Sequence, residues 1–412
     1  MSEGAARKGR EGAGVLPSRT FSPWQRAMPP AVCDVAVVGG GIMAAATAYA
    51  LRRLDPSLRV ALLEAETLAF GASGRNAGFL LLGTHTDYAS AVEAYGRDRA
   101  RRLWRFTAEN AALVRDELDG RAFDLRFTGN VLAAGDAAEA ERLRRATALL
   151  AEDGVETEYV DGEAANARLG TRGFAGVQFV SEGGTLHPAK LVRHLAALSG
   201  ATVLEGWPVD RIAADGAGVR LGGPSGTLTA GQVVLTLNAY LPRLVPEAAR
   251  FVRPVRAQML ATAPVAPVTD RPVYSHEGFY YLRQQPDGRL LLGGARHRHV
   301  EAEVGYADLT TGALQADLLT YLRDHFPAAG APAVERRWSG TMGFSPDSLP
   351  VVGAVPGVPG ARFATGFTGH GMGFGVRFGY LLARTVLGQT DDAADLFDAV
   401  RFGAPGGNVV RS

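Results

Sequence analysis

Cysteine and lysine are almost missing from this sequence, which has 412 residues but a single cysteine, Cys33. Lys8 and Lys190 are its only lysines, so nearly all of its 43 basic residues are arginines. One cysteine excludes an intrachain disulfide and a cysteine-based zinc site. The alternating arginines and histidines of residues 296–299 do not form a convincing set of metal ligands. We therefore predict no metal site.

Long apolar runs and a strong net charge are also missing. No run reaches the length of about 18 apolar residues that a membrane span needs, and the formal net charge is +1. This balance removes the electrostatic case for a nucleic-acid partner. Residues 1–30 lack the apolar core of a secretory signal, so a flexible tail and a cytoplasmic location are expected.

The pattern of apolar residues predicts a βαβ unit near the N-terminus, with strands at 34–38 and 59–64 and a helix at 42–54. The α/β segments at the start, middle and end of the chain enclose segments that resemble antiparallel β-structure. We therefore predict an α/β fold, α+β overall, with two domains whose segments interleave. Further helices are predicted at 88–120, 136–153, 186–199, 307–325 and 371–387, and further strands at 123–134, 202–204, 232–237, 279–283 and 289–292.

A glycine-rich turn joins the first strand to the first helix with the pattern Gly39-x-Gly41-x-x-Ala44. The first glycine permits a tight turn, the second lets backbone approach a pyrophosphate, and the alanine permits close helix–strand packing. Glu64, at the end of the second strand, is placed to accept hydrogen bonds from a ribose. The unit predicts a dinucleotide site and does not choose between FAD and NAD. The alternative is a tight turn without a ligand.

Further motifs follow in order along the chain: residues 71–79 (GASGRNAGF), 184–188 (GTLHP), 338–353 (WSGTMGFSPDSLPVVG) and 364–373 (ATGFTGHGMG). The first resembles the flavin-contacting loop of the D-amino acid oxidase superfamily of FAD-dependent oxidoreductases. The last two resemble its C-terminal signature and the turn that opens its final helix. The superfamily includes glycine oxidase, monomeric sarcosine oxidase and gamma-glutamylputrescine oxidase. The resemblance spans about residues 32–390 and favours FAD.

The resemblance implies a Rossmann-type FAD-binding domain of residues 31–88, 185–245 and 336–395. A smaller substrate domain, an antiparallel sheet with helices, takes residues 89–184 and 246–335. Flexible tails are expected at 1–30 and 396–412. The FAD contacts are expected from Gly39, Gly41, Ile42, Ala44, Glu64, Ser73, Gly74, Arg75, Asn76, Ala77, Val209, Gly343, Gly369, His370, Gly371 and Met372.

Two departures from the superfamily concern the flavin itself. Several relatives attach it through cysteine or histidine, but Cys33 is far in sequence from any attachment point, and Arg75 stands where some relatives have a flavin-linked histidine. We therefore predict non-covalent FAD. Sarcosine oxidases place a lysine over the flavin to promote reaction with oxygen, whereas the matching position here is Leu291. The sequence therefore does not choose between oxygen and another compound as the electron acceptor.

A third departure concerns the substrate. Glycine oxidase clamps its substrate carboxylate with an arginine of the C-terminal signature, and Met342 takes that position here. A simple α-amino acid is therefore less favoured than an amine or an N-substituted amino acid. An aromatic wall would suit an amine through cation–π attraction, and adjacent tyrosines on a strand point to opposite faces. The substrate-facing candidates are Tyr280, Tyr281, Arg296, Met342 and His370.

These observations lead to a hypothesis of an FAD-dependent oxidoreductase that oxidises the CH–NH bond of an amine or N-substituted amino acid to an imine. The expected partners are that small molecule and an electron acceptor. One alternative is an NAD-dependent dehydrogenase, which leaves the glycine turns at 71–79 and 364–373 unexplained. A second alternative is a non-catalytic flavoprotein subunit, which the residues Leu291 and Met342 keep open.

Overall fold

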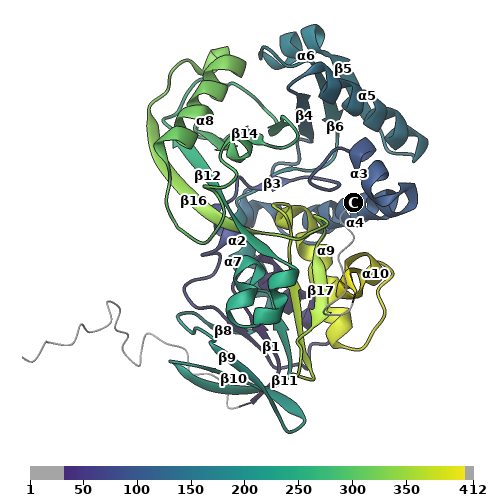
Figure 1. Ribbon diagram of the computed structural model, residues 1–412, viewed down its shortest axis with the longest axis vertical. Coiled ribbons are helices and arrows are strands. Elements are labelled where there is room, and N and C mark those ends of the chain that lie inside the picture. The colour runs from purple at the N-terminus through teal and green to yellow at the C-terminus, as the bar shows by residue number, and fades with distance from the viewer. Residues whose placement is uncertain (1–31, 404–412) are drawn as a thin grey trace, which may run out of the picture.

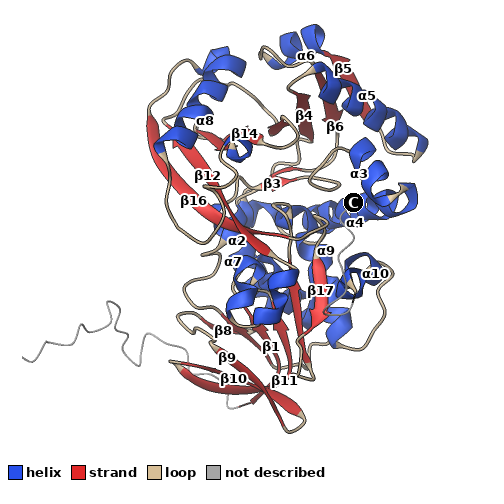
Figure 2. Ribbon diagram, viewed as in Figure 1, coloured by secondary structure: helices blue, strands red, loops and turns tan. Residues whose placement is uncertain are grey.

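Two eight-stranded sheets organise the protein, whose computed structural model describes residues 32–403 (Figure 1, Figure 2). The predicted tail of residues 1–30 lies outside the described residues. In Figure 1 the first sheet occupies the lower part of the molecule and the second the upper part, with helices α2, α4 and α9 between them.

The first sheet is mainly parallel and contains the predicted βαβ unit. Alternate residues of its central strand enter two apolar clusters, since Val35 and Val37 pack on one face and Ala36 and Val38 on the other. Burial of both faces is characteristic of parallel sheets covered on each side. Its order is β17 (Val351–Ala354), β18 (Ala361–Thr365), β11 (Gly226–Leu235), β1 (Val32–Val38), β2 (Val60–Leu63) and β8 (Thr202–Leu204), extended through β11 by β10 (Gly218–Gly223) and β9 (Arg211–Asp215).

The second sheet is antiparallel except for the parallel pair β4–β13. Its order is β16 (Val334–Phe344), β12 (Arg253–Thr262), β15 (Leu290–Gly294), β14 (Tyr280–Gln284), β13 (Val273–Ser275), β4 (Asn130–Ala134), β6 (Gly176–Val180) and β5 (Thr157–Asp161). A two-stranded ladder of β3 (Phe79–Leu80) and β7 (Gly184–Thr185) is separate.

The helices cover both sheets. Those of the first are α1 (Ile42–Leu54), α4 (Arg97–Asp116), α7 (Pro188–Ser199) and α9 (Gly371–Val386), with α2 (Ala72–Arg75) and α10 (Ala394–Phe397). Those near the second are α3 (Tyr88–Tyr95), α5 (Ala137–Glu152), α6 (Gly162–Leu169) and α8 (Gly312–His325). Short 3-10 helices are η2 (Gly120–Phe123), η3 (Asn238–Arg243), η4 (Pro246–Arg250), η5 (Arg296–Arg298), η6 (Pro327–Ala329) and η7 (Ala399–Phe402).

Helices α1 and α9 pack with their backbones close together. A Cβ atom added at Gly379 of α9 would lie 2.4 Å from the carbonyl carbon of Ala46, and one at Gly375 would lie 3.3 Å from Ile42. Both partners in α1 are fully or almost fully buried. Glycine in α9 and alanine in α1 therefore set the separation of the two helices.

The sequence predicted elements at the start of the chain and beyond it, since α5, α7, β8 and α9 also agree with their predicted bounds within two residues. Helix α1 has the predicted bounds, and β1 and β2 agree within two residues. The strand predicted at 123–134 was too long, because its first residues form η2 and an irregular segment before β4. Residues 336–344 were assigned to the FAD-binding domain, but β16 pairs with β12 in the second sheet.

The C-terminal tail was predicted to begin too early. Residues 399–402 form η7, and Val352 of β17 bridges to Asp398. Arg401 holds this segment against the rest of the fold, because its guanidinium donates to Asp347 and to the carbonyl oxygens of Leu349 and Pro350. The remaining domain boundaries stay a prediction.

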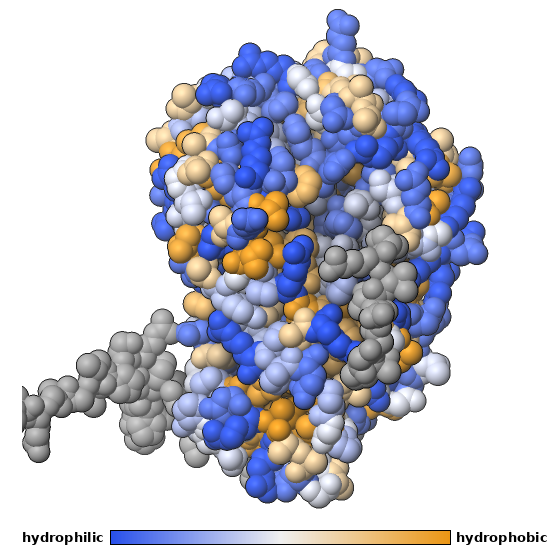
Figure 3. All heavy atoms as spheres, in the orientation of Figure 1, coloured by the Kyte–Doolittle hydropathy of each residue, from blue (hydrophilic) through white to orange (hydrophobic). Residues whose placement is uncertain are grey.

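In the face shown in Figure 3, hydrophilic side chains cover most of the upper part, and apolar side chains occur in smaller groups. No helix within residues 32–403 is both long and apolar enough to cross a membrane.

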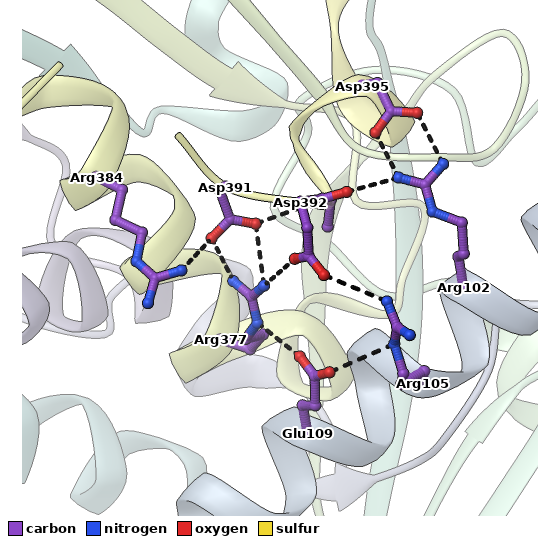
Figure 4. A network of polar contacts seen from close by, with 9 residues as sticks. Arg102, Arg105, Glu109, Arg377, Arg384, Asp391, Asp392 and Asp395 are labelled. Carbon is purple, nitrogen blue, oxygen red and sulfur yellow. Dashed lines mark hydrogen bonds and ion pairs between the residues drawn. The ribbon is translucent and has the colours of Figure 1, made fainter. Parts of the chain in front are cut away.

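An ion-pair network ties α4 and α9 to the C-terminal segment (Figure 4). Arg377 of α9 donates to both carboxylate oxygens of Asp391, at 2.8 and 3.0 Å, and to Glu109 of α4 at 2.8 Å. The side chains of Arg377 and Asp391 are only 9% and 1% exposed. Arg102 forms a second, more exposed pair with Asp395.

We expect Asp391→Ala to lower the free energy of unfolding by about 3 kcal/mol, because it leaves the buried guanidinium of Arg377 without its bidentate partner. Asp395→Ala is the control, with an expected loss below about 1 kcal/mol because that carboxylate is 66% exposed. Urea unfolding of the two variants measures both. Equal losses would show that burial of the Arg377–Asp391 pair is not what matters.

Candidate active site

A cavity of about 450 Å³, here called the main cavity, lies where the carboxyl ends of the first sheet face the second sheet. Its walls come from the N-termini of α1 and α9, from α2 and from β12, β14 and β16. Ligands of open α/β sheets bind at the carboxyl ends of the strands. The topology therefore gathers segments far apart in the sequence around one ligand-sized space.

The glycine turn after β1 opens one end of the main cavity. Gly39 has a φ of 112°, which L side chains rarely adopt, and its N–H donates to the Leu63 carbonyl at 2.7 Å. Gly41 and Ile42 line the cavity, and the Ile42 N–H donates to the Ser73 hydroxyl at 2.9 Å. The loop of α2 is thus held against the N-terminus of α1, where an anionic group is favoured.

Glu64 follows β2 beside this turn. Its carboxylate accepts the Glu66 N–H at 2.8 Å, and a Cβ at Gly40 would lie 2.7 Å from its side chain. Burial raises the pKa of Glu64. Gly40 is not one of the three residues of the predicted motif, yet this position needs a glycine so that Glu64 can lie against the turn.

The N-terminus of α9 opens into the same cavity. Gly369 has a φ of 81°, and Gly369, His370, Gly371 and Met372 all line the cavity. The Thr368 N–H donates to the Gly343 carbonyl at 2.8 Å and so joins this turn to β16. The first N–H groups of a helix have no partner inside it and carry partial positive charge. Two helix N-termini therefore favour negative charge in one cavity.

One face of the second sheet forms the opposite wall. Tyr281 of β14, Met259 of β12 and Tyr274 of β13 line the main cavity, and burial raises the pKa of Tyr281 to about 12. Tyr280 was predicted as a substrate-facing candidate, but it points away. Its ring stacks on Tyr321 at 4.1 Å between ring centroids, in the core on the other face. Strand alternation separates the two tyrosines.

Arginines reach the cavity from three elements. Arg75 of α2 pairs with Asp308 at 2.8 Å, so its charge is already balanced. Arg296 of η5 lies over the rings of Phe279 and Phe344, 5.0 and 4.6 Å from their centroids. Among residues 32–403, no carboxylate pairs with Arg296, and burial lowers its pKa. Arg253 of β12 is the third arginine of the wall.

Two histidines, His85 and His370, line the main cavity together with Tyr274. His370 and Tyr274 meet edge to face at 5.8 Å between ring centroids. Burial lowers the pKa of His85 and of His370 to about 4, so both are neutral at physiological pH. Nδ1 of each ring lacks a hydrogen-bond partner among the described residues. Buried polar atoms of this kind are usually satisfied by a ligand or water.

The main cavity brings together thirteen of the predicted site residues: Gly41, Ile42, Ser73, Arg75, Asn76, Ala77, Tyr281, Arg296, Met342, Gly369, His370, Gly371 and Met372. Outside its wall lie Gly39, Ala44, Glu64, Gly74, Val209, Tyr280 and Gly343. Gly74 and Gly343 serve close packing, because an added Cβ would lie 2.0 Å from the Ala69 oxygen and 2.3 Å from Asn238 Oδ1, respectively. Val209 packs against the apolar cluster of the first sheet.

Sequence reasoning missed His85, Arg253, Met259 and Tyr274 as wall residues. None lies in a glycine motif, and Tyr274 belongs to a strand of three residues. His85 lies in an irregular segment between β3 and α3. Alternation along β12 could have paired Met259 with Ala257, which also lines the cavity. The other positions carry no local signal, because tertiary structure alone places them.

Comparison with known proteins agrees with this architecture. A family model described as DAO, FAD dependent oxidoreductase, matches residues 34–385. A probable oxidoreductase OrdL of Rhizobium meliloti (strain 1021) is 29% identical over 393 residues, which are 92% of this chain and 89% of that protein. The gamma-glutamylputrescine oxidoreductase of Escherichia coli (strain K12) is 26% identical over 406 residues, covering 95% and 92%.

Solved structures share the fold. The glycine oxidase of Geobacillus kaustophilus superposes with a TM-score of 0.73 at 24% identity, covering 89% of this chain and 98% of that one. The L-proline dehydrogenase of P. horikoshii gives a TM-score of 0.76 at 21% identity, covering 90% and 98%. The chain belongs to the DAO family of FAD-dependent oxidoreductases, which confirms the predicted family, fold class and cofactor.

The residues present fit FAD. The turn at Gly39 and Gly41 and the N-terminus of α1 would hold the pyrophosphate, and Glu64 would accept hydrogen bonds from the ribose. The N-terminus of α9 lines the main cavity and would favour negative charge on a flavin bound there. Cys33 lies in β1, is 1% exposed and has a pKa raised to about 11 by burial. It is a buried core residue, not a flavin tether.

We expect Glu64→Gln to weaken FAD binding about tenfold, because an amide accepts ribose hydroxyl hydrogen bonds less strongly than a carboxylate. Glu66→Gln is the matched control, and its affinity should stay within about twofold of the parent. Titrating apoprotein with FAD and following the quenching of flavin fluorescence measures both. An equal effect of the two variants would contradict the role of Glu64.

We also expect acid precipitation to release all FAD into the supernatant, because the cysteine is buried in β1 and Arg75 occupies the first-loop position. Absorbance of the supernatant and mass spectrometry of the protein measure the outcome. A yellow pellet, or a protein mass increased by that of FAD, would show a covalent link.

Proposed function

We propose that this enzyme oxidises the CH–NH bond of an amine that carries a carboxylate, such as an N-substituted amino acid, to an imine that water hydrolyses. The observation that carries the proposal is the guanidinium of Arg296, which lines the main cavity without a carboxylate partner among residues 32–403. Burying an unpaired charge is costly. A substrate carboxylate would balance it.

Arg296 can also take the place of the carboxylate-binding arginine that is missing at Met342. The missing arginine of the C-terminal signature disfavours a glycine-oxidase-like clamp on β16. Arg296 reaches the same strand from η5, because its guanidinium lies over Phe344, two residues beyond Met342 and on the same face. The carboxylate anchor is then supplied from another element, which supports an amino-acid-like substrate held in a different orientation.

The other wall residues favour a neutral amine. Tyr281, Met259 and Phe344 present apolar surface, and a low dielectric disfavours the protonated form of a buried amine. His85 and His370 are neutral and can accept a hydrogen bond from the amine nitrogen without adding a positive charge beside it. Bound FAD supplies the hydride acceptor at its N5 position. The chain's own task is to orient the substrate and exclude water.

The names of the relatives support this substrate class. They include a gamma-glutamylputrescine oxidoreductase, a glycine oxidase and a sarcosine oxidase subunit beta, all of which are named for amines or amino acids. The final electron acceptor is oxygen or another oxidant. Leu291 packs in an apolar cluster with Met259, Tyr281 and Trp338 and brings no charge to this wall.

The test is an anaerobic screen of amines, amino acids and N-alkyl amino acids for bleaching of the visible flavin band. Carboxylate-bearing amines should bleach it fastest, and the rate at which air restores the colour measures the reaction with oxygen. A holoenzyme that none of these compounds bleaches would overturn the proposal.

We expect Arg296→Met to lower kcat/KM for the best carboxylate substrate about 100-fold, mainly by raising KM, because a charge-assisted contact is lost. Arg298→Met is the matched control, since Arg298 lies in the same short helix, is 56% exposed and pairs with Asp317. Its kcat/KM should stay within about twofold. An unchanged KM in Arg296→Met would show that this residue does not hold the carboxylate.

A further inference from the structure

A second cavity of about 150 Å³, which we call the side chamber, adjoins the main cavity. The two share a wall formed by Leu81, His85, Thr86, Tyr274, Glu277 and His370. Behind this wall the chamber is enclosed by residues of α3, α4, α5, β4 and β6. Its volume is about five times the share of liquid volume of one water molecule, so it can admit the end of an extended substrate.

Asn130 places an unsatisfied acceptor in the chamber wall. Its side chain is fully buried, and its Nδ2 donates to the carbonyl oxygens of Leu80 and Glu182, at 3.3 and 2.8 Å. These two acceptors fix the orientation of the amide, because only the nitrogen can donate to them. Oδ1 of Asn130 is left without a partner among the described residues. The chamber therefore calls for a hydrogen-bond donor.

Two donor side chains of the chamber wall, those of Gln178 and Arg142, are already engaged. Nε2 of Gln178 donates to the Thr147 hydroxyl at 2.8 Å. The guanidinium of Arg142 pairs with Glu277, and its Nε lies 3.9 Å from Asp87 Oδ2. A ligand that brings only acceptors would find few free donors here.

The charged side chains of the chamber wall also favour a ligand that carries a hydrogen-bond donor and a positive charge. Three carboxylates, those of Asp87, Glu139 and Glu277, face one guanidinium, that of Arg142. His85 and His370 are neutral because burial lowers the pKa of each to about 4. The wall is therefore net negative at neutral pH and attracts a cation.

We propose that the side chamber is a subsite for the distal end of the substrate, and that this end carries a second amino group. The inference rests on the proposed oxidation of an amine in the main cavity. The reacting nitrogen lies in the main cavity, the carbon chain passes between His85 and His370, and the distal ammonium donates to Asn130 Oδ1 near Asp87. Substrates with a second nitrogen at the far end are then preferred over those ending in a methyl group.

The test compares N-(ω-aminoalkyl)glycines with N-alkylglycines of the same chain length on the FAD-loaded enzyme, so that both series keep the carboxylate and the amine of the proposed substrate. Affinity is measured by the change in flavin absorbance on anaerobic binding, and turnover by bleaching of the flavin band. We expect at least tenfold tighter binding of the amino-terminated compound at the chain length that spans both cavities. Equal affinity at every length would overturn the subsite. Binding preference without bleaching by either series would keep the subsite and count against the proposed oxidation.

Two variants test whether the binding preference arises in the side chamber or elsewhere in the protein. Asp87→Asn removes a charge but keeps an oxygen that can cap α3, where Asp87 accepts the Ser90 N–H at 2.9 Å. Leu132→Phe fills chamber volume from β4. Each should reduce the preference for the amino-terminated compound over the alkyl compound at least fivefold.

The control is Asp136→Asn, because Asp136 caps α5 in the same manner from an exposed position outside the chamber. The Asp136→Asn variant should bind the amino-terminated compound with the same preference as the parent enzyme. Thermal unfolding of each holoenzyme shows whether the variants fold. A preference that survives in both folded variants, Asp87→Asn and Leu132→Phe, would overturn the proposal.

Discussion

The contact between α1 and α9 is the constraint on which the rest of the site depends. Gly379 lies against Ala46 with no room for a Cβ atom, and Gly375 lies against Ile42. This separation lets both helices begin at one cavity, although more than 300 residues separate their starts in the sequence. Two helix N-termini then provide partial positive charge at two parts of the same ligand. The buried pair of Arg377 and Asp391 holds α9 in this position from its other side.

The second sheet contributes contacts of a different kind. The N-termini of the helices and the glycine turns present backbone groups, whereas β12 and β14 present side chains of residues that no motif contains, and β16 presents Met342 and Phe344 of the motif at 338–353. Backbone recognition suits a cofactor that every family member shares. Side chains on a sheet can change without disturbing the fold, so substrate selection is expected there. Arg296, over Phe344, illustrates this division.

Local patterns were enough for the cofactor half of the molecule. Gly39, Gly41 and Ala44 sit within one turn and one helix, so their spacing is a local property, and the helix predicted at 42–54 has the observed bounds. Alternation along β14 correctly implied that only one of two adjacent tyrosines faces the cavity, but it could not say which one. Tyr281 is that residue, because the register of β14 with β15 turns Tyr280 toward α8.

Composition and motif spacing by themselves determined the family, the fold class and the FAD cofactor, because each depends on residues close together in sequence. Tertiary structure decided which other side chains line the main cavity. His85 and Tyr274 come from an irregular segment and a short strand, and they meet only because the second sheet folds over the first. The orphaned oxygen of Asn130 is also a tertiary property, since its amide orientation depends on carbonyl groups 50 and 52 residues away.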